Sequence, residues 1–271
     1  MEDQEIVSVA ALLDVCSRAL SRALGDDRVW FRGLDRAYPE GELVPAAFRG
    51  DAAKNEYPLL MEFQLAAPSR HQPVPQTDDH VGWLALAQHH GLATRLLDWT
   101  ESLLVACHFA TAGSKEDPGE IWLLRADALN EVMAGYRARA LPTDRTVQLA
   151  AGQAFRENDL PEGSRQAYRD LVLAFEPTQT SPRIMIQRGK FTIHGSGEPL
   201  EKHPFRADWL TRLSLTPKAK QEIRTLLLLA GIDKAYLFPD LDNLTDRVMS
   251  MYEPQEPYRV IGSPVAPPEE G

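Results

Sequence analysis

Three short segments of this chain place polar and charged side chains where they could do chemistry. The first, Trp30-Phe31-Arg32-Gly33, brings strand-forming residues up to an arginine and a glycine. A guanidinium at the end of a strand can project into a cleft, where its planar fork suits a phosphate or a carboxylate. Gly33 lets a second backbone or a ligand approach closely. The alternative for Arg32 is an internal ion pair with one of the 39 acidic residues.

The second segment, residues 87–102, is the richest in polar groups, which sit here between a helix and a buried helix. Buried polar groups need partners, so this density indicates either a rigid hydrogen-bond network or a site. Arg95 and Asp98 could pair with each other. Asp98 could also cap the following helix, with Glu101 completing an imperfect capping box.

The third segment runs from Arg183 through Gln187 to a glycine break and a strand. On a short helix these two residues are i and i+4, so they share a face. The amide of Gln187 could reach a ligand hydroxyl. A capping or sheet-edge hydrogen bond is the alternative.

Several common chemistries lack their motifs. The sequence contains no Gly-x-Ser-x-Gly elbow, no Walker A loop and no Gly-x-Gly-x-x-Gly after a strand. It also lacks Cys-x-x-Cys and His-Glu-x-x-His spacing. The adjacent His89 and His90 cannot both face one point from a helix. We therefore expect no bound metal.

Composition limits the classes of protein further. Of the 271 residues, 44% are hydrophobic and 25% are charged, as in globular proteins. The net charge of −10 argues against broad nucleic-acid binding, although folding could still gather arginines in a local cleft. No apolar stretch approaches the roughly 20 residues that span a bilayer. An acidic N-terminus and two cysteines in apolar runs, Cys16 and Cys107, predict a cytoplasmic protein without disulfides.

These segments must be positioned by a mixture of helices and strands with no regular alternation. Helical spacing predicts helices over residues 5–24, 54–66, 79–90, 101–112, 216–231 and 237–251. Strand patterns cover residues 29–31, 119–124, 171–175, 191–194 and 209–215, and a short helix begins at Ser181-Pro182. We predict an α+β fold with three parts: an N-terminal helix (1–24), one domain (25–252) and a proline-rich flexible tail (253–271). The domain has a central β-sheet, either continuous or split, that is flanked by helices. Residues 139–165 are expected to be a variable insertion.

Together these segments resemble the FRG domain, a family named for its Phe-Arg-Gly motif. The resemblance spans about residues 25–250, and its central element is the most specific part. The matching motifs are Phe31-Arg32-Gly33, Gln88-His89-His90-Gly91, Thr94-Arg95-Leu96-Leu97-Asp98-Trp99-Thr100, His108-Phe109-Ala110, Arg183 with Gln187-Arg188-Gly189-Lys190-Phe191, and Gly231-Ile232 with Leu237-Phe238-Pro239-Asp240-Leu241.

The order of an early arginine, a central polar segment and a late polar residue is also similar to ADP-ribosyltransferase folds, which bind NAD in a cleft of a split sheet. That resemblance implies NAD as substrate and a bacterial toxin or phage-defence effector with a macromolecular acceptor and a neutralising partner. It implies three catalytic positions, Arg32, Thr94 and Gln187. It also implies that NAD is contacted by Phe31, Gly33, His89, His90, Arg95, Asp98 and Arg183.

One departure keeps other functions open. Cleavage of the glycosidic bond of NAD passes through an oxocarbenium-like state that a carboxylate can stabilise, and Gln187 cannot act as a general base. Asp98 or Glu101 could supply the charge, the acceptor could need no base, or catalysis could be lost. The alternatives are a non-catalytic nucleotide- or partner-binding module and an RNA-modifying enzyme or nuclease.

Overall fold

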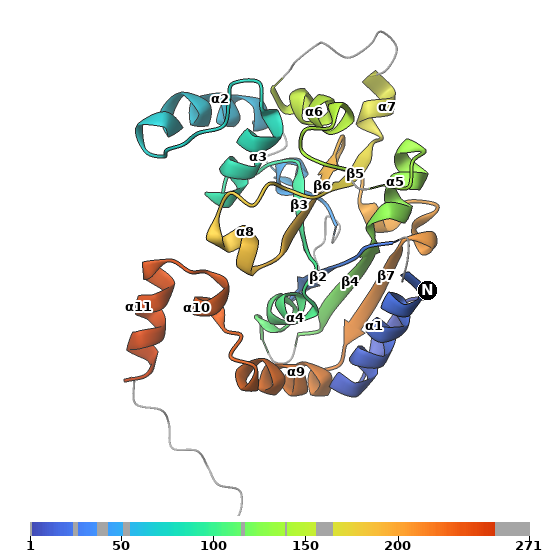
Figure 1. Ribbon diagram of the computed structural model, residues 1–271. Coiled ribbons are helices and arrows are strands. Elements are labelled where there is room, and N and C mark those ends of the chain that lie inside the picture. Colours follow the sequence, from blue (N-terminus) through green and yellow to red (C-terminus); the bar gives the residue numbers. More distant parts are fainter. Residues whose placement is uncertain are drawn as a thin grey trace, which may run out of the picture.

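A computed structural model describes residues 2–23, 27–36, 43–50, 55–114, 117–138, 140–155 and 165–252. Within these ranges the chain forms a seven-stranded sheet with helices on both faces (Figure 1). The strand order is β1-β7-β4-β2-β3-β6-β5. The strands are β1 (Gln4–Ile6), β2 (Val29–Leu34), β3 (Leu96–Thr100), β4 (Gly119–Arg125), β5 (Val172–Phe175), β6 (Gly189–His194) and β7 (Leu210–Leu215). The edge strand β1 runs parallel to β7, and every other neighbouring pair is antiparallel.

The sheet is nearly divided between β2 and β3. These two strands register through a single pair, Phe31 opposite Thr100. By contrast, β2 pairs with β4 over Val29 to Leu34, and β3 pairs with β6 over Leu96 to Thr100. Two half-sheets therefore meet at one point and diverge from it, which is the split form of the predicted central sheet.

The two faces of the sheet carry different cores. One face has a continuous core that includes Trp30, Trp99, Trp122 and Trp209, covered by α5. On the opposite face, α1, α4 and α9 pack on the half-sheet of β2, whereas α2, α3 and α6 pack on the half-sheet of β3 (Figure 1). The α-helices are α1 (Val9–Ala23), α2 (Glu56–Ala66), α3 (His80–His89), α4 (Leu103–Thr111), α5 (Ala126–Ala134), α6 (Arg145–Gly152), α7 (Arg165–Arg169), α8 (Pro182–Ile186), α9 (Pro217–Leu229), α10 (Lys234–Leu237) and α11 (Leu241–Ser250).

Capping residues fix several helix starts where the sequence predicts them. The side chains of Asp79, Ser181 and Thr216 each accept a hydrogen bond from a backbone N–H three residues ahead. Pro182 and Pro217 occupy first-turn positions, where the missing N–H costs nothing. These starts of α3, α8 and α9 are confirmed.

Other expectations are corrected. Residues 96–100 form strand β3, although the sequence suggested only a polar link between two helices. Asp98 therefore lies inside a strand and does not cap α4; Ser102 accepts the capping bond from the Val105 N–H. Strand β1 precedes α1, and α6 occupies part of the expected insertion, 139–165. The proline-rich tail, 253–271, lies outside the described residues.

Gly33 belongs to β2 and is required by the helix above it. A Cβ at this position would lie 1.9 Å from the Ala106 carbonyl oxygen and 2.7 Å from the Ala110 nitrogen. Helix α4 therefore rests directly on the β2 backbone, which only glycine permits. The close approach predicted for Gly33 is that of a second backbone segment.

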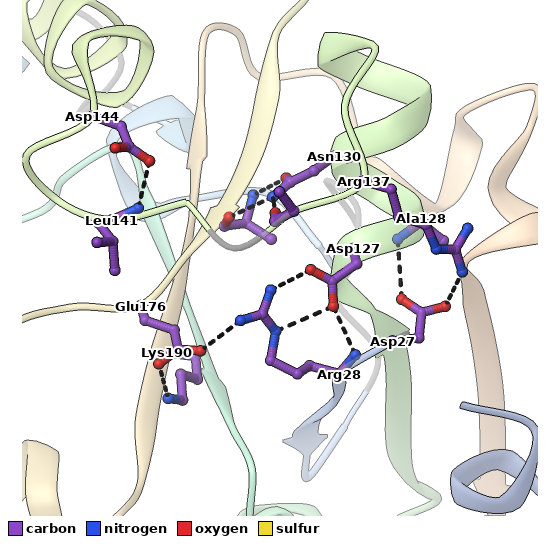
Figure 2. A network of polar contacts seen from close by, with 12 residues as sticks. Asp27, Arg28, Asp127, Ala128, Asn130, Arg137, Leu141, Asp144, Glu176 and Lys190 are labelled. Carbon is purple, nitrogen blue, oxygen red and sulfur yellow. Dashed lines mark hydrogen bonds and ion pairs between the residues drawn. The ribbon is translucent and has the colours of Figure 1, made fainter. Parts of the chain in front are cut away.

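An ion-pair network ties the half-sheets together away from their point of divergence (Figure 2). The Arg28 guanidinium, just before β2, bonds Asp127 of α5 and lies 3.1 Å from Glu176, just after β5. Glu176 also lies 3.1 Å from the Lys190 ammonium of β6. These partners come from both halves, so the network links the two half-sheets.

Two further expectations concern the cysteines and membrane association. Cys16 and Cys107 are buried and free, and burial raises the pKa of each thiol to about 12. None of the helices in the described ranges is long and apolar enough to cross a membrane.

Candidate functional site

A cavity of about 310 Å³ opens where the half-sheets diverge. It takes its walls from the end of β2, from β3, from one side of α4 and from α8. The lining residues are Phe31, Arg32, Gly33, Leu34, Asp35, Asp98, Trp99, Thr100, Val105, Phe109, Ala112, Arg183 and Gln187. Six of the ten predicted site residues are therefore brought together: Phe31, Arg32, Gly33, Asp98, Arg183 and Gln187.

Arg32 reaches across the gap between the half-sheets. Its Nη1 donates a hydrogen bond of 2.7 Å to the Asp98 carbonyl oxygen and lies 4.0 Å from the Asp98 carboxylate. The side chain retains 18% of its exposure. Arg32 thus bridges β2 to β3 and lines the cavity, and its contact with the Asp98 carboxylate is the acidic pairing considered as the alternative for this residue.

Asp98 is the more open of this pair, with a side chain 65% exposed. Its Oδ1 accepts a 2.8 Å hydrogen bond from Gln88 Nε2. The Gln88 amide oxygen in turn accepts from the Thr94 hydroxyl. The chain from Thr94 through Gln88 orients the Asp98 carboxylate and leaves its surface accessible.

Arg183 and Gln187 share one face of the α8 region, as predicted, and both line the cavity. The Gln187 Nε2 donates a 3.0 Å bond to the Leu237 carbonyl, and the Gln187 carbonyl accepts a 2.6 Å bond from the Thr100 hydroxyl. The amide donor therefore serves a structural contact, which is the alternative considered for Gln187. The Arg183 guanidinium lies over the Phe238 ring, 4.6 Å from its centroid.

Thr94 and Arg95 are not brought to this cavity. Arg95 is 6% exposed and pairs with Glu56 of α2, with 2.6 Å between Nη2 and Oε2 and further bonds from Nε. The suggested pairing of Arg95 with Asp98 is therefore wrong. Thr94 is buried, and its hydroxyl binds Gln88. Both residues precede β3: Thr94 contacts the site only through Gln88, and Arg95 pairs with α2.

The rings of the two adjacent histidines pack edge to face, with centroids 5.0 Å apart, but they differ in exposure. His89 lines a small cavity of about 90 Å³ beside Asp98 and Gln187, whereas His90 is exposed and its ring packs edge-on against His71. The pKa of His89 is lowered by burial and by the positive charges of Arg183, His90 and His71. In the described part of the chain, no group of three or more His, Cys, Asp or Glu could hold a metal ion.

Sequence reasoning missed some residues around the site. Asp35 and Phe109 line the cavity, and Phe109 packs edge-on against Phe238. His194, the last residue of the predicted strand 191–194, is fully buried, and its Nε2 contacts the Thr192 hydroxyl at 2.8 Å. Burial, with the charges of Arg32 and Arg95, lowers its pKa to about 3. The apolar-polar alternation of Phe191 to His194 would place His194 on the solvent face, so the sequence carried no signal for its burial.

Comparison with known proteins gives one match. Residues 27–118 match the family model of the FRG domain. That range runs from just before β2 to just before β4, and it includes Arg32, Asp98 and Phe109. Arg183 and Gln187 lie beyond it, so the third element of the expected resemblance falls outside the matched part. No curated protein and no solved structure matches the chain.

Proposed function

We propose that this chain, whose residues 27–118 match the FRG-domain model, is an NAD-dependent ADP-ribosyltransferase whose active site is the cavity between the half-sheets. The observation that carries this proposal is that Arg32, Asp98 and Gln187 line one cavity at the division of a split sheet. In this proposal NAD is the substrate, and no metal is required.

The charges around the cavity suit both the phosphates of NAD and the ribose that becomes positively charged during the reaction. Arg32 of β2 and Arg183 of α8 both line the cavity, and guanidinium groups bind phosphate oxygens with charge-assisted hydrogen bonds. Asp98 offers an accessible carboxylate between them. An anionic dinucleotide with a ribose that develops positive charge would meet complementary charge at both places.

Asp98 is the better of the two carboxylates considered for the missing glutamate. Glu101 does not line the cavity and lies 3.2 Å from the Lys190 ammonium, so its charge is already balanced. Asp98 is held by Gln88 and faces the opening. We assign to Asp98 the stabilisation of the ribose cation, and to Gln187 the positioning of a ribose hydroxyl through its amide oxygen.

The transfer step balances as follows. The bond between the ribose C1′ and the nicotinamide nitrogen breaks, and its electron pair returns to the pyridine ring, which leaves as neutral nicotinamide. A lone pair of the acceptor then forms the new bond to C1′. The proton that the acceptor loses passes to the Asp98 carboxylate or to water.

The test is transfer of label from NAD to the macromolecules of a bacterial extract. Wild type and Arg169→Ala, an exposed arginine away from the cavity, are expected to transfer label. Arg32→Ala and Asp98→Asn are expected to transfer little. Absence of both label transfer and NAD consumption by wild type, with a candidate acceptor and partner supplied, would contradict the proposal.

The engaged amide of Gln187 favours one second candidate, a module that binds a nucleotide without turnover. It predicts that NAD raises the melting temperature of the wild type but is recovered intact.

In the enzyme proposal the protein acts in the cytoplasm, where NAD is available, as a bacterial toxin or defence effector restrained by a neutralising partner. A growth assay with induced wild type and Asp98→Asn tests that role.

A further inference from the structure

A second and larger cavity lies on the other side of α8 from the first. Its volume is about 500 Å³, and its walls come from the segment before α3, from α3 itself and from the segment between β5 and α8. Apolar surface dominates: Pro73, Pro75, Pro142, Pro177, Leu86 and Ile184 line it. Polar side chains, including His71 and Thr178, stand among them. Proline rings and aliphatic side chains offer surfaces suited to a flat heteroaromatic ring.

A small cavity of about 90 Å³ connects the two larger ones. It shares Asp98, Trp99, Arg183 and Gln187 with the first cavity. It shares Ala85, His89 and Ile184 with the second. The three cavities therefore form a series around α8, and the small one is the passage between the other two.

The passage holds one cation, the Arg183 guanidinium, and one carboxylate, that of Asp98. Among the described residues, the recorded partner of the Arg183 guanidinium is the Phe238 ring, and no carboxylate pairs with it. His89 lines the same passage, and its pKa is lowered by burial first and then by the nearby Arg183 charge. A guanidinium that is not held in an ion pair can bind an anion, and the imidazole beside it can donate a hydrogen bond to the same anion.

The first cavity is small for a whole dinucleotide. Pockets for small molecules and cofactors span about 300–1,000 Å³, and a volume of about 310 Å³ lies at the lower end of that range. A dinucleotide consists of two nucleosides joined by a diphosphate. Two cavities joined by a passage that Arg183 lines have the same arrangement of parts.

We propose that NAD occupies all three cavities, with the nicotinamide riboside in the first, the diphosphate at Arg183 and His89, and the adenosine in the second. This inference rests on the proposed function, because it assigns subsites to the same substrate. Arg183 is then the residue that selects a diphosphate, and the second cavity selects an adenine-containing nucleotide. The alternative occupant of the second cavity, the macromolecular acceptor, is an outcome of the test.

The experiment fills the second cavity from its exposed rim. Thr178→Trp places an indole in this cavity, whereas Gln179→Trp, the exposed neighbour that does not line it, is the matched control. Binding of NAD, AMP and nicotinamide mononucleotide is measured by calorimetry for both variants and for wild type. We expect Thr178→Trp to weaken NAD and AMP binding by about tenfold or more and to leave the mononucleotide within about twofold.

Arg183→Ala provides the second arm, with Arg188→Asn as its control. Arg188 is exposed, lines none of the three cavities and has a φ of 48°, which asparagine tolerates. Arg183→Ala should weaken all three ligands about tenfold or more, because each loses a charge-assisted bond to phosphate. Melting curves confirm that the variants are folded.

The outcomes separate this inference from the proposed function. Equal NAD affinity in Thr178→Trp and Gln179→Trp would overturn the adenosine subsite, even if wild type transfers label. NAD binding that is retained in Thr178→Trp while label transfer to the acceptor is lost would assign the cavity to the acceptor and also overturn it. Failure of wild type to bind NAD would overturn both, whereas NAD binding without turnover would overturn only the enzymatic function.

Discussion

Replacing Arg95 and Arg32 separately should show that Arg95 stabilises the fold and that Arg32 binds NAD. Arg95 is 6% exposed, and its guanidinium makes three contacts of 2.6–3.2 Å to the Glu56 carboxylate. Arg95→Ala removes these and leaves a buried carboxylate whose remaining bond comes from the Arg95 backbone N–H. Breaking a buried pair from one side costs about 3–5 kcal/mol, and the surviving backbone bond places the expected loss near about 3 kcal/mol.

Arg32→Ala removes a bond to the Asp98 carbonyl from a side chain that is 18% exposed. Water can replace part of that contact, so the expected loss of unfolding free energy is about 1–2 kcal/mol. Affinity for NAD should follow the opposite order, with the larger loss in Arg32→Ala. It should fall about tenfold or more in Arg32→Ala, because a cation at the cavity is lost, and stay within about threefold in Arg95→Ala.

Urea unfolding at pH 7 gives the stabilities, and calorimetry at a temperature where both variants are folded gives the affinities. The double variant Glu56→Leu with Arg95→Met is the control, because replacing both partners by apolar residues should recover most of the stability lost in Arg95→Ala. A stable Arg95→Ala that no longer binds NAD would refute this reasoning. Arg95 would then be a ligand-binding residue, as its place in the motif suggests.

Two further predictions concern Gly33 and His194. Gly33→Ala should lower the unfolding free energy by about 3 kcal/mol or more, because its Cβ would lie 1.9 Å from the Ala106 carbonyl oxygen and force α4 away from β2. An unchanged midpoint of urea unfolding would show instead that α4 can shift at little cost in stability. His194 has a folded-state pKa of about 3, below its unfolded value, so stability should fall as pH decreases below about 6.5. Its share between pH 6.5 and pH 5 is about 1.6 kcal/mol, and His194→Gln should reduce the loss of stability between these two pH values by that amount in urea titrations. An unchanged loss would assign it to other groups.

Local signals predicted the parts of the fold that local physics decides. Capping residues and first-turn prolines located α8 and α9, and apolar runs located β4 and β5. The sequence missed β3 because Asp98 interrupts its apolar pattern. That strand is an interior one of the sheet, and the aspartate is tolerated there because it faces the gap where the half-sheets diverge.

The sequence identified most residues of the candidate site but not the contacts that they make in the fold. Arg32, Asp98 and Gln187 meet although they lie far apart in sequence, and the family resemblance supplied that expectation. The placement of Arg95 depended on Glu56, a residue that no motif singled out. Long-range partners of this kind are set by tertiary packing, which local patterns do not encode.

The central claim is that Asp98 supplies the charge that Gln187 cannot. The measurement is the steady-state release of nicotinamide from NAD by wild type and by Asp98→Asn, with NAD affinity measured in parallel. The exchange keeps the size of the side chain and removes its charge. We predict that Asp98→Asn binds NAD within about threefold of wild type and releases nicotinamide about 100-fold more slowly. Equal rates of release by the two proteins, or no release by wild type supplied with its acceptor, would contradict the account.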